Sequence, residues 1–293
     1  MSKLSITESQ NDNTINIDLM SSLEIARAIN AEDQKVALAI EKVLPQVAQA
    51  IDIIAKAFLR GGRLAYFGAG TSGRLGIVDA SEMPPTFGVS SDMVQGFIAG
   101  GECALLSAVE NAEDNSKFAQ QDISTFNPSK KDVVVAISAN GNPKYCITAL
   151  KMAQQLGAKT IAISSNPKAQ IAQYAEIFIN PIVGPEVITG SSRMKSGTAQ
   201  KMILNMLTTG AMIRIGKTYK NYMIDLQLNN KKLVERGIRF ISEICGISQT
   251  SAASYLKEAQ NVKTACVMAM KKCTKEEANV LLARHKGILR KVI

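Results

Sequence analysis

Three glycines near residue 70 form the segment whose residue types most directly suggest a chemistry. Gly68, Gly70 and Gly73 have the G-x-G-x-x-G spacing of a dinucleotide-binding loop. Such a loop also needs a second strand ending in an acidic residue about 20 positions later, which holds the ribose hydroxyls. The sequence there reads SEMPPTFGVSSDMVQG, with two prolines and no apolar strand that ends in an acid. The pattern therefore argues against NAD.

The same turn also departs from a nucleotide P-loop, because Arg and Leu follow Gly73 where that motif requires Lys and then Ser or Thr. What remains is a glycine turn that carries Thr71 and Ser72 into the start of a helix. Backbone N–H groups, a helix dipole and two hydroxyls suit one sugar or one phosphate group. We therefore predict that Gly70, Thr71 and Ser72 contact a small ligand.

Two further polar turns follow apolar runs later in the chain, and a polar, basic stretch precedes a long helix. They contain Ser138, Asn140 and Gly141, then Ser164, Ser165 and Asn166, and finally Ser191, Ser192, Arg193 and Lys195. Turns that follow parallel strands gather at the carboxyl edge of the sheet, where ligands bind. Together they predict a site for a small polar anion such as a phosphorylated sugar. The alternative is that they are ordinary helix caps.

An alternation of strands and helices must position these turns. Short apolar runs begin at residues 63, 93, 132, 158 and 175, each followed by a turn or a helical stretch. Strands that alternate with helices predict a doubly wound parallel sheet with helices on both faces, of the α/β class. We expect an N-terminal arm and helices in residues 1–55, the sheet domain in 56–228 and a small helical subdomain in 229–293. Pro45 should divide the N-terminal helix, and residues 1–20 read as a mobile or loosely docked arm.

The remaining composition excludes several classes of chemistry. His285 is the only histidine, so neither a Ser-His-Asp triad nor a histidine metal site fits the main body. The five cysteines include no C-x-x-C pair, which argues against a disulfide framework and favours a reduced, cytoplasmic setting. The chain shows no apolar signal core and no run of about 18 apolar residues, so we expect no membrane span.

The net charge of +9 is concentrated near the C-terminus. Residues 231–293 contain 13 Lys and Arg against 5 Asp and Glu, whereas residues 1–230 are nearly neutral. A basic tail can bind nucleic acid or acidic lipid. Here the charges are interleaved with apolar residues, which favours a solvated helical surface, and we expect no nucleic-acid or membrane partner.

Several carboxylates near the glycine turn compete for the role of general acid or base. They are Asp79, Glu82, Glu102, Glu110, Glu113 and Asp114. Spacing alone does not choose among them, because helix N-terminal acids and solvated acidic helix faces have the same pattern.

Three long motifs resemble one family. The segments GAGTSGRLGIVDASEMPPTFG, IAGGECALLSAVENAEDN and VGPEVITGSSRMKSGTAQKMILNML are similar to those of N-acetylmuramic acid 6-phosphate etherases, and the resemblance extends from residue 21 to the helical tail. It implies a sugar isomerase (SIS) domain with a flavodoxin-like sheet, a homodimer, a phosphosugar substrate and no metal or organic cofactor. It also implies release of D-lactate from carbon 3 of the sugar, leaving N-acetylglucosamine 6-phosphate, in the recycling of cell-wall amino sugars.

The resemblance also implies that Glu82 and Glu113 carry the chemistry. An ether oxygen leaves poorly unless a base removes the proton on carbon 2 of the ring-opened sugar and an acid protonates the departing oxygen. We assign Glu82 as the proton donor and Glu113 as the base, although the sequence does not fix which does which. Burial of one carboxyl against an apolar wall would keep it protonated near neutral pH.

The turn after the third apolar run departs from both the fold family and the etherases. Many SIS domains have Ser-x-Ser-Gly-x-Thr there, and etherases have Ala-Ser-Gly-Arg-Thr-Pro, whereas this chain has SANGNP, residues 138–143. Asn140 still supplies an amide donor. Ser191, Ser192, Arg193 and Lys195 can compensate by binding a phosphate or the lactyl carboxylate, with Glu186 as a partner for one cation. The alternative for that cluster is charge pairing at a dimer interface.

Two other functions remain open on the same fold. An aldose–ketose phosphosugar isomerase would use one carboxylate at carbon 2 and would need no acid for a leaving lactate. A non-enzymatic phosphosugar sensor would use the basic tail to contact a regulator. We also hypothesise that residues of one chain complete the pocket of the other chain of the dimer.

Overall fold

A computed structural model describes residues 6–293, which form two compact units. The first contains residues up to Ser81 and Asp92–Thr208, and the second contains Glu82–Ser91 and Thr209–Ile293. The short segment Glu82–Ser91 therefore groups with the C-terminal part of the chain. The domain boundaries expected after residues 55 and 228 remain a prediction.

The first unit is built on a five-stranded parallel sheet with the strand order β2-β1-β3-β4-β5. The strands are β1 (Leu64–Gly68), β2 (Val94–Ile98), β3 (Val133–Ile137), β4 (Lys159–Ile163) and β5 (Ile177–Ile179). All five residues of β1 and of β3 are buried. Strands covered on both faces need apolar side chains in both directions, which explains their continuous apolar runs. The predicted doubly wound parallel sheet is confirmed.

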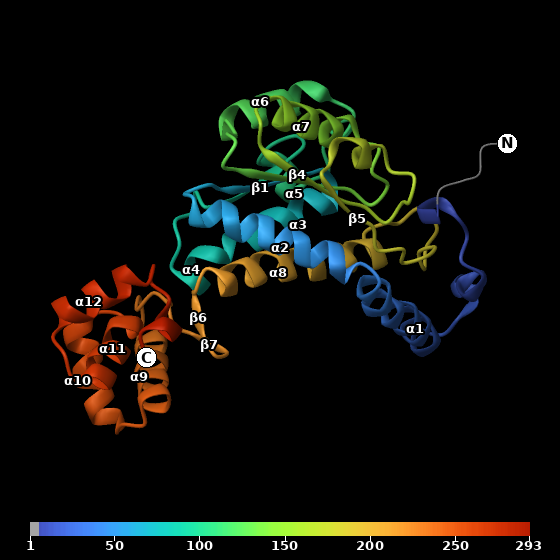
Figure 1. Cartoon of the computed structure of the whole chain (residues 1–293). Coiled ribbons are helices and arrows are strands. Elements are labelled where there is room, and N and C mark those ends of the chain that lie inside the picture. Colours follow the sequence, from blue (N-terminus) through green and yellow to red (C-terminus); the bar gives the residue numbers. More distant parts are fainter. Residues whose placement is uncertain (1–5) are drawn as a thin grey trace. The chain divides into compact units, whose positions relative to one another are not determined.

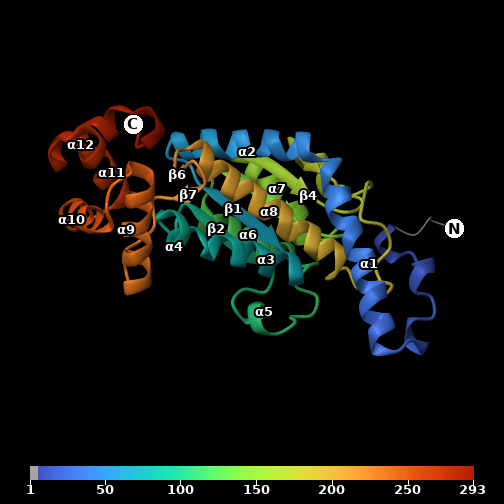
Figure 2. The same cartoon turned by 90° about the horizontal axis from the view of Figure 1, so that it is seen from below.

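Helices cover both faces of this sheet. Figures 1 and 2 show α6 and α7 on one face and α2, α3 and α8 on the other. The helices of this unit are α1 (Ser22–Glu41), α2 (Leu44–Leu59), α3 (Gly70–Ser81), α5 (Cys103–Leu106), α6 (Ser116–Phe126), α7 (Lys144–Gln155) and, up to Thr208, α8 (Lys195–Arg214). Four short 3-10 helices accompany them: η1 (Ile6–Glu8), η2 (Asp12–Thr14), η3 (Ile17–Leu19) and η4 (Gln170–Tyr174).

Alternate residues of the strands face opposite helical layers, as the period of two requires. Phe67 of β1 packs in the cluster with α6 and α7, where its ring stacks on Phe97 at 4.8 Å. Its neighbour Tyr66 faces α3 instead, and a Cβ on Gly76 of that helix would lie 2.8 Å from the Tyr66 Cβ. The missing side chain at Gly76 lets α3 lie close to the sheet, directly after the glycine turn.

The N-terminal segment is docked by specific hydrogen bonds. Asn11 Nδ2 donates to the carbonyl of Pro185 at 3.1 Å, and Thr14 Oγ1 donates to the carbonyl of Val187 at 2.8 Å. The expectation of a loose arm was therefore wrong for residues 11–14, and residues 1–5 lie outside the described part. Pro45 lies in the first turn of α2, after a break that follows Glu41, as predicted.

The second unit is mainly helical. It contains α4 (Met83–Phe87), the hairpin of β6 (Thr218–Tyr219) and β7 (Tyr222–Met223), α9 (Lys231–Cys245), α10 (Gln249–Ala259), α11 (Val262–Lys271), α12 (Lys275–Arg284) and η5 (Leu289–Lys291). Polar side chains cap the four long helices at their N-termini, and Thr274 with Glu277 forms a capping box. His285 is exposed at the C-cap of α12. Within residues 6–293, no helix has the length and apolar character needed to cross a membrane.

Candidate functional site

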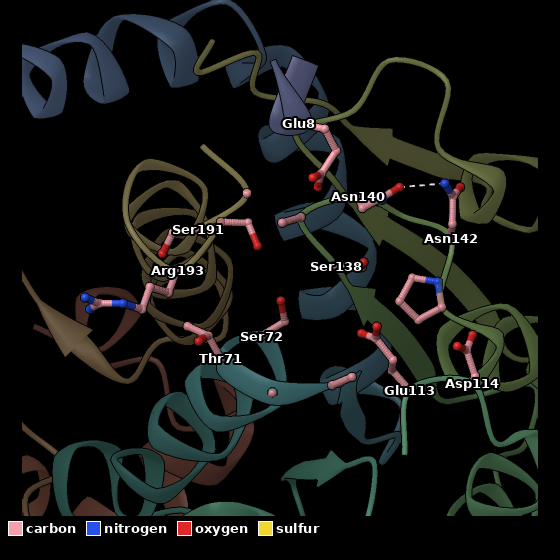
Figure 3. A pocket seen from close by; sticks show the side chains of 16 residues that line it. Glu8, Thr71, Ser72, Glu113, Asp114, Ser138, Asn140, Asn142, Ser191 and Arg193 are labelled. Atoms are coloured by element: carbon pink, nitrogen blue, oxygen red, sulfur yellow. Dashed lines mark hydrogen bonds between the residues drawn. The ribbon is translucent and has the colours of Figure 1, made fainter. Parts of the chain in front are cut away.

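A cavity of about 520 Å³ lies in the first unit, beyond the carboxyl ends of β1 and β3. The strand order reverses direction between these two strands, and such a switch point is where open α/β sheets bind ligands. Figure 3 shows the side chains that surround it. The lining residues are Glu8, Ala69, Gly70, Thr71, Ser72, Glu113, Asp114, Ser138, Ala139, Asn140, Asn142, Pro143, Gly190, Ser191, Ser192 and Arg193.

The glycine turn forms one side of this cavity. Gly70 begins α3 in a left-handed conformation with φ of +52°, and Thr71 and Ser72 follow it along the cavity wall. A Cβ on Gly73 would lie 2.6 Å from the carbonyl oxygen of Gly68 and 2.7 Å from Ile98 Cγ1. The glycine spacing therefore serves close packing of α3 against the strands, which brings the helix N-terminus and its two hydroxyls to the cavity.

The second polar turn forms the opposite side. Ser138 Oγ accepts a hydrogen bond from the Gly141 N–H at 2.9 Å, so its own proton is free to point elsewhere. Asn142 Nδ2 donates to Asn140 Oδ1 (Figure 3), which fixes the carboxamide of Asn140. Gly141 does not line the cavity. Its φ is +79° and a Cβ would lie 2.2 Å from Ala169 Cβ, so this position requires glycine.

The third polar turn supports the second turn and does not line the cavity. Ser164 Oγ donates to the carbonyl of Ala139 at 3.0 Å, and Asn166 Nδ2 donates to the carbonyl of Asn140 at 2.9 Å. Both side chains are buried. The prediction that the three turns lie at one edge of the sheet is confirmed. The first two turns carry side chains that line the cavity, and the third turn holds the second turn in position.

The segment before α8 contributes Ser191, Ser192 and Arg193 to the cavity. Figure 3 shows the guanidinium of Arg193 directed away from Glu113. Lys195 does not line the cavity, because its ammonium group is buried against Glu32. These residues were predicted as one cluster, and the structure divides them between the cavity and the interior.

Glu186 caps α8. Its carboxylate accepts hydrogen bonds from the backbone N–H groups of Lys195 at 2.8 Å and Ser196 at 3.0 Å. The expectation that it pairs with a cationic side chain therefore differs from the structure. A negative charge at a helix N-terminus is stabilising because the exposed N–H groups there carry partial positive charge.

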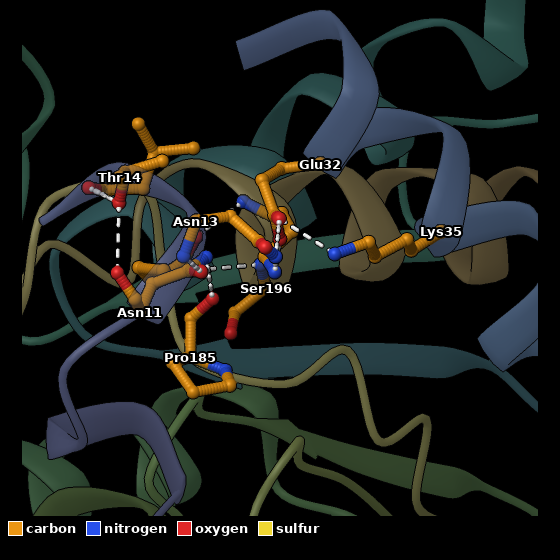
Figure 4. A network of polar contacts seen from close by, with 10 residues as sticks. Asn11, Asn13, Thr14, Glu32, Lys35, Pro185 and Ser196 are labelled. Atoms are coloured by element: carbon orange, nitrogen blue, oxygen red, sulfur yellow. Dashed lines mark hydrogen bonds and ion pairs between the residues drawn. The ribbon is translucent and has the colours of Figure 1, made fainter. Parts of the chain in front are cut away.

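Lys195 and Glu32 belong to a polar network that ties α1 and the N-terminal segment to the start of α8 (Figure 4). Glu32 also accepts hydrogen bonds from Lys35 at 2.6 Å and from Asn13 at 3.0 Å. Burial alone would raise the pKa of this carboxyl, but the hydrogen bonds from two lysines and two asparagines outweigh it and lower the pKa to about 2.

Three carboxylates reach the cavity: Glu8, Glu113 and Asp114. Glu113 also lines a second, smaller cavity, so it lies where the two meet. Glu82 is exposed at the N-cap of α4 and belongs to the second unit, whereas all residues that line the two cavities belong to the first. Glu8 was missed by sequence reasoning, since nothing local in the N-terminal segment marks it as a cavity residue.

Two buried groups near the cavity are structural. Burial, together with the nearby charge of Glu113, raises the pKa of the Cys146 thiol to about 12, so this cysteine is no nucleophile. Burial raises the pKa of Asp79 on α3, although hydrogen bonds from three donors lower it. These donors are Tyr66 at 3.0 Å, Asn205 at 2.9 Å and Thr208 at 3.2 Å. Asp79 thus fastens α3 to β1 and α8.

Comparison with family models defines the class of protein. Residues 46–154 match the glucokinase regulatory protein N-terminal SIS domain, residues 108–210 match the SIS domain, and residues 220–260 match the C-terminal lid domain of glucokinase regulatory protein. A putative phosphosugar isomerase involved in capsule formation from Bacteroides fragilis NCTC 9343 has the same fold, with a TM-score of 0.50, 21% identity, and coverage of 65% of this chain and 91% of that one. The fold is that of an SIS-domain protein.

Curated relatives narrow the class to one family. The N-acetylmuramic acid 6-phosphate etherase of Actinobacillus pleuropneumoniae serotype 7 is 52% identical over 98% of this chain and 95% of its own length. That of Edwardsiella ictaluri strain 93-146 is 54% identical over 97% of this chain and 95% of its own length. The chain belongs to the N-acetylmuramic acid 6-phosphate etherase family, as the sequence motifs predicted.

Proposed function

We propose that this protein is a carbon–oxygen lyase that converts N-acetylmuramic acid 6-phosphate to N-acetylglucosamine 6-phosphate and D-lactate. The observation that carries the proposal is the position of Glu113 in a cavity formed by polar turns, in a chain that is similar to etherases over 97–98% of its length. Hydroxyls and helix N–H groups suit a phosphorylated sugar, and a carboxylate beside them supplies a base.

The proposed chemistry begins at carbon 2 of the ring-opened sugar, where the carbon 1 aldehyde acidifies the attached hydrogen. Glu113 takes this proton, and the electron pair forms the double bond between carbons 2 and 3 as the bond to the lactyl oxygen breaks. Glu82, whose role follows from the family resemblance, gives a proton to that oxygen, so that lactate leaves with a neutral hydroxyl group and not as an alkoxide. Glu82 lines neither cavity of its own chain, so this role requires the pocket shared between two chains of the dimer that we hypothesise. Water then adds its hydroxyl to carbon 3 and its proton to carbon 2.

The phosphate is proposed to bind between the two lining turns. Thr71 and Ser72 at the start of α3 offer hydroxyl donors, and Ser138 and Asn140 face them from the turn after β3. Ser191, Ser192 and Arg193 close the same side of the cavity. Gly70, Gly141 and Lys195, also predicted as binding residues, contribute through the backbone shape of the turns and the anchoring of α8.

Assembly and location are part of the proposal. The family resemblance favours a homodimer in the cytoplasm that uses no metal or organic cofactor. If residues of one chain complete the pocket of the other, dilution below the dimer dissociation constant abolishes activity. Full activity of a verified monomer would contradict shared sites.

The direct test is D-lactate release from N-acetylmuramic acid 6-phosphate in buffer with EDTA. We expect release by the wild type and a loss of about 10²–10⁴-fold in Glu113→Gln and Glu82→Gln, the range for removal of a general acid or base. Asp114→Asn, a change to a neighbouring acid of the same cavity, is the matched control and should retain most activity. Release that is unaffected by Glu113→Gln would remove this residue from the mechanism, and isomerisation without lactate would favour the isomerase alternative.

A further inference from the structure

The smaller cavity, of about 250 Å³, opens beside the polar one and shares Ala69, Gly70 and Glu113 with it. Its walls differ in character. Most of its other lining residues are small and apolar, namely Ala99, Ala104, Ala108, Val109 and Ala112. One cation also lines it, Arg74. A space with methyl-sized apolar walls and a single guanidinium suits a short chain that carries both a methyl group and a carboxylate.

Arg74 is held in place by backbone groups and not by an acid. Its Nε donates to the carbonyl of Leu105 at 2.9 Å, and its Nη2 donates to the carbonyl of Ser107 at 3.2 Å. Carbonyls orient a guanidinium without neutralising it. Among residues 6–293 no carboxylate lies within ion-pair distance of Arg74, and no hydrogen bond occupies its Nη1. An oriented guanidinium with free N–H donors is the preferred protein group for binding a carboxylate.

We propose that this cavity is the subsite for the D-lactyl group and that Arg74 binds its carboxylate. The inference rests on the proposed function, because it uses Glu113 as the base at carbon 2. If carbon 2 lies at Glu113, the lactyl oxygen on the adjacent carbon 3 lies at the junction of the two cavities. The phosphate on carbon 6 then occupies the polar cavity, and the lactyl methyl packs against the alanines.

Glu110 also lines the smaller cavity and is exposed. Its negative charge disfavours a bound carboxylate, so its removal should leave lactyl binding unchanged or strengthen it. The opposite signs of Arg74 and Glu110 in one cavity provide a matched pair of variants. The acetamido group on carbon 2 is the competing occupant, and it has a methyl group but no charge.

The test compares two ligands that differ only at carbon 3. Substrate and N-acetylglucosamine 6-phosphate are titrated by calorimetry into the full chain carrying Glu113→Gln, which slows turnover, with and without Arg74→Gln. We expect Arg74→Gln to weaken substrate binding about tenfold or more, the effect of one lost charge-assisted hydrogen bond, and to change binding of the product less than about twofold. Arg74→Lys should recover part of the loss, and Glu110→Gln should weaken neither ligand.

A second variant tests the space without touching the hydrogen bonds of Arg74. Ala108 is exposed and lines the cavity, so Ala108→Leu narrows it without disturbing the core. It should also weaken the substrate more than the product. If Arg74→Gln and Ala108→Leu weaken the binding of substrate and product equally, the proposed subsite is wrong and Arg74 only anchors the loop at residues 105–107. The proposed subsite is also wrong if neither variant weakens the binding of either ligand. Because these are binding measurements, a protein that binds both ligands but releases no lactate would contradict the proposed function separately.

Discussion

Lys195 Nζ and Glu32 Oε2 form an ion pair whose two side chains are almost inaccessible to solvent, with exposed fractions of 1% and 3%. The pair joins the first residue of α8 to the middle of α1. The same Glu32 also binds Lys35, whose side chain is 50% exposed. One carboxylate therefore has a buried and an exposed cationic partner, and the two differ in what their loss should cost.

Glu32→Gln should destabilise the protein by about 3–5 kcal/mol, because removing one partner leaves the other charge buried and uncompensated. Lys35→Met is the matched control and should cost about 0–1 kcal/mol, since its charge is solvated. Urea unfolding measures both. A cost for Glu32→Gln as small as that of the control would show that water reaches Lys195 when its partner is absent.

The depressed pKa of Glu32 predicts a pH dependence of stability. Its pKa falls from 4.5 to about 2 on folding, so the unfolded chain binds the proton more tightly. The stabilisation is complete above pH 4.5 and is lost as the pH falls toward 2. The difference in unfolding free energy between wild type and Glu32→Gln should therefore be constant near neutral pH and shrink across that acidic window. A difference that does not change with pH would assign the stabilisation to packing.

We expect substitutions of two glycines in the glycine turn, Gly73 and Gly70, to differ in their cost to stability. A side chain at Gly73 would lie 2.6 Å from the Gly68 carbonyl, so Gly73→Ala must push α3 off the strands and should cost about 1–3 kcal/mol. Gly70 has open space and a φ of +52°, a conformation that Asn tolerates. Gly70→Asn should cost less than about 1 kcal/mol. Thermal unfolding compares them, and a loss for Gly73→Ala as small as that for Gly70→Asn would show that α3 shifts to accept the added methyl group at little cost.

The position of Glu8 at the cavity predicts that the N-terminal segment takes part in binding the substrate. Its carboxylate lies at the cavity, where it can accept a hydrogen bond from a sugar hydroxyl or amide (Figure 3). Glu8→Gln should raise KM by about tenfold with little change in kcat. Asp12→Asn is the control, because Asp12 is exposed on the same segment and does not line the cavity. A similar KM for both variants would show that Glu8 does not contact the substrate.

The elements of the site were predictable because they depend on local patterns. Buried parallel strands read as short apolar runs, glycine spacing marks a close turn, and Ser or Asn after a strand marks the edge where ligands bind. These patterns identified Thr71, Ser72, Ser138 and Asn140 as cavity residues. Long motifs identified the family.

The sequence by itself thus determined the sheet, the lining turns and the family, all of which follow from periods and motifs within short stretches of chain. Tertiary structure decided which charged groups reach the cavity. Glu8 comes from a segment more than 100 residues away from Glu113 in sequence, and Lys195 turns inward because Glu32 on α1 neutralises it. Charge pairing across such separations leaves no local pattern, because whether a charged side chain is buried or exposed depends on a partner that only the fold brings beside it.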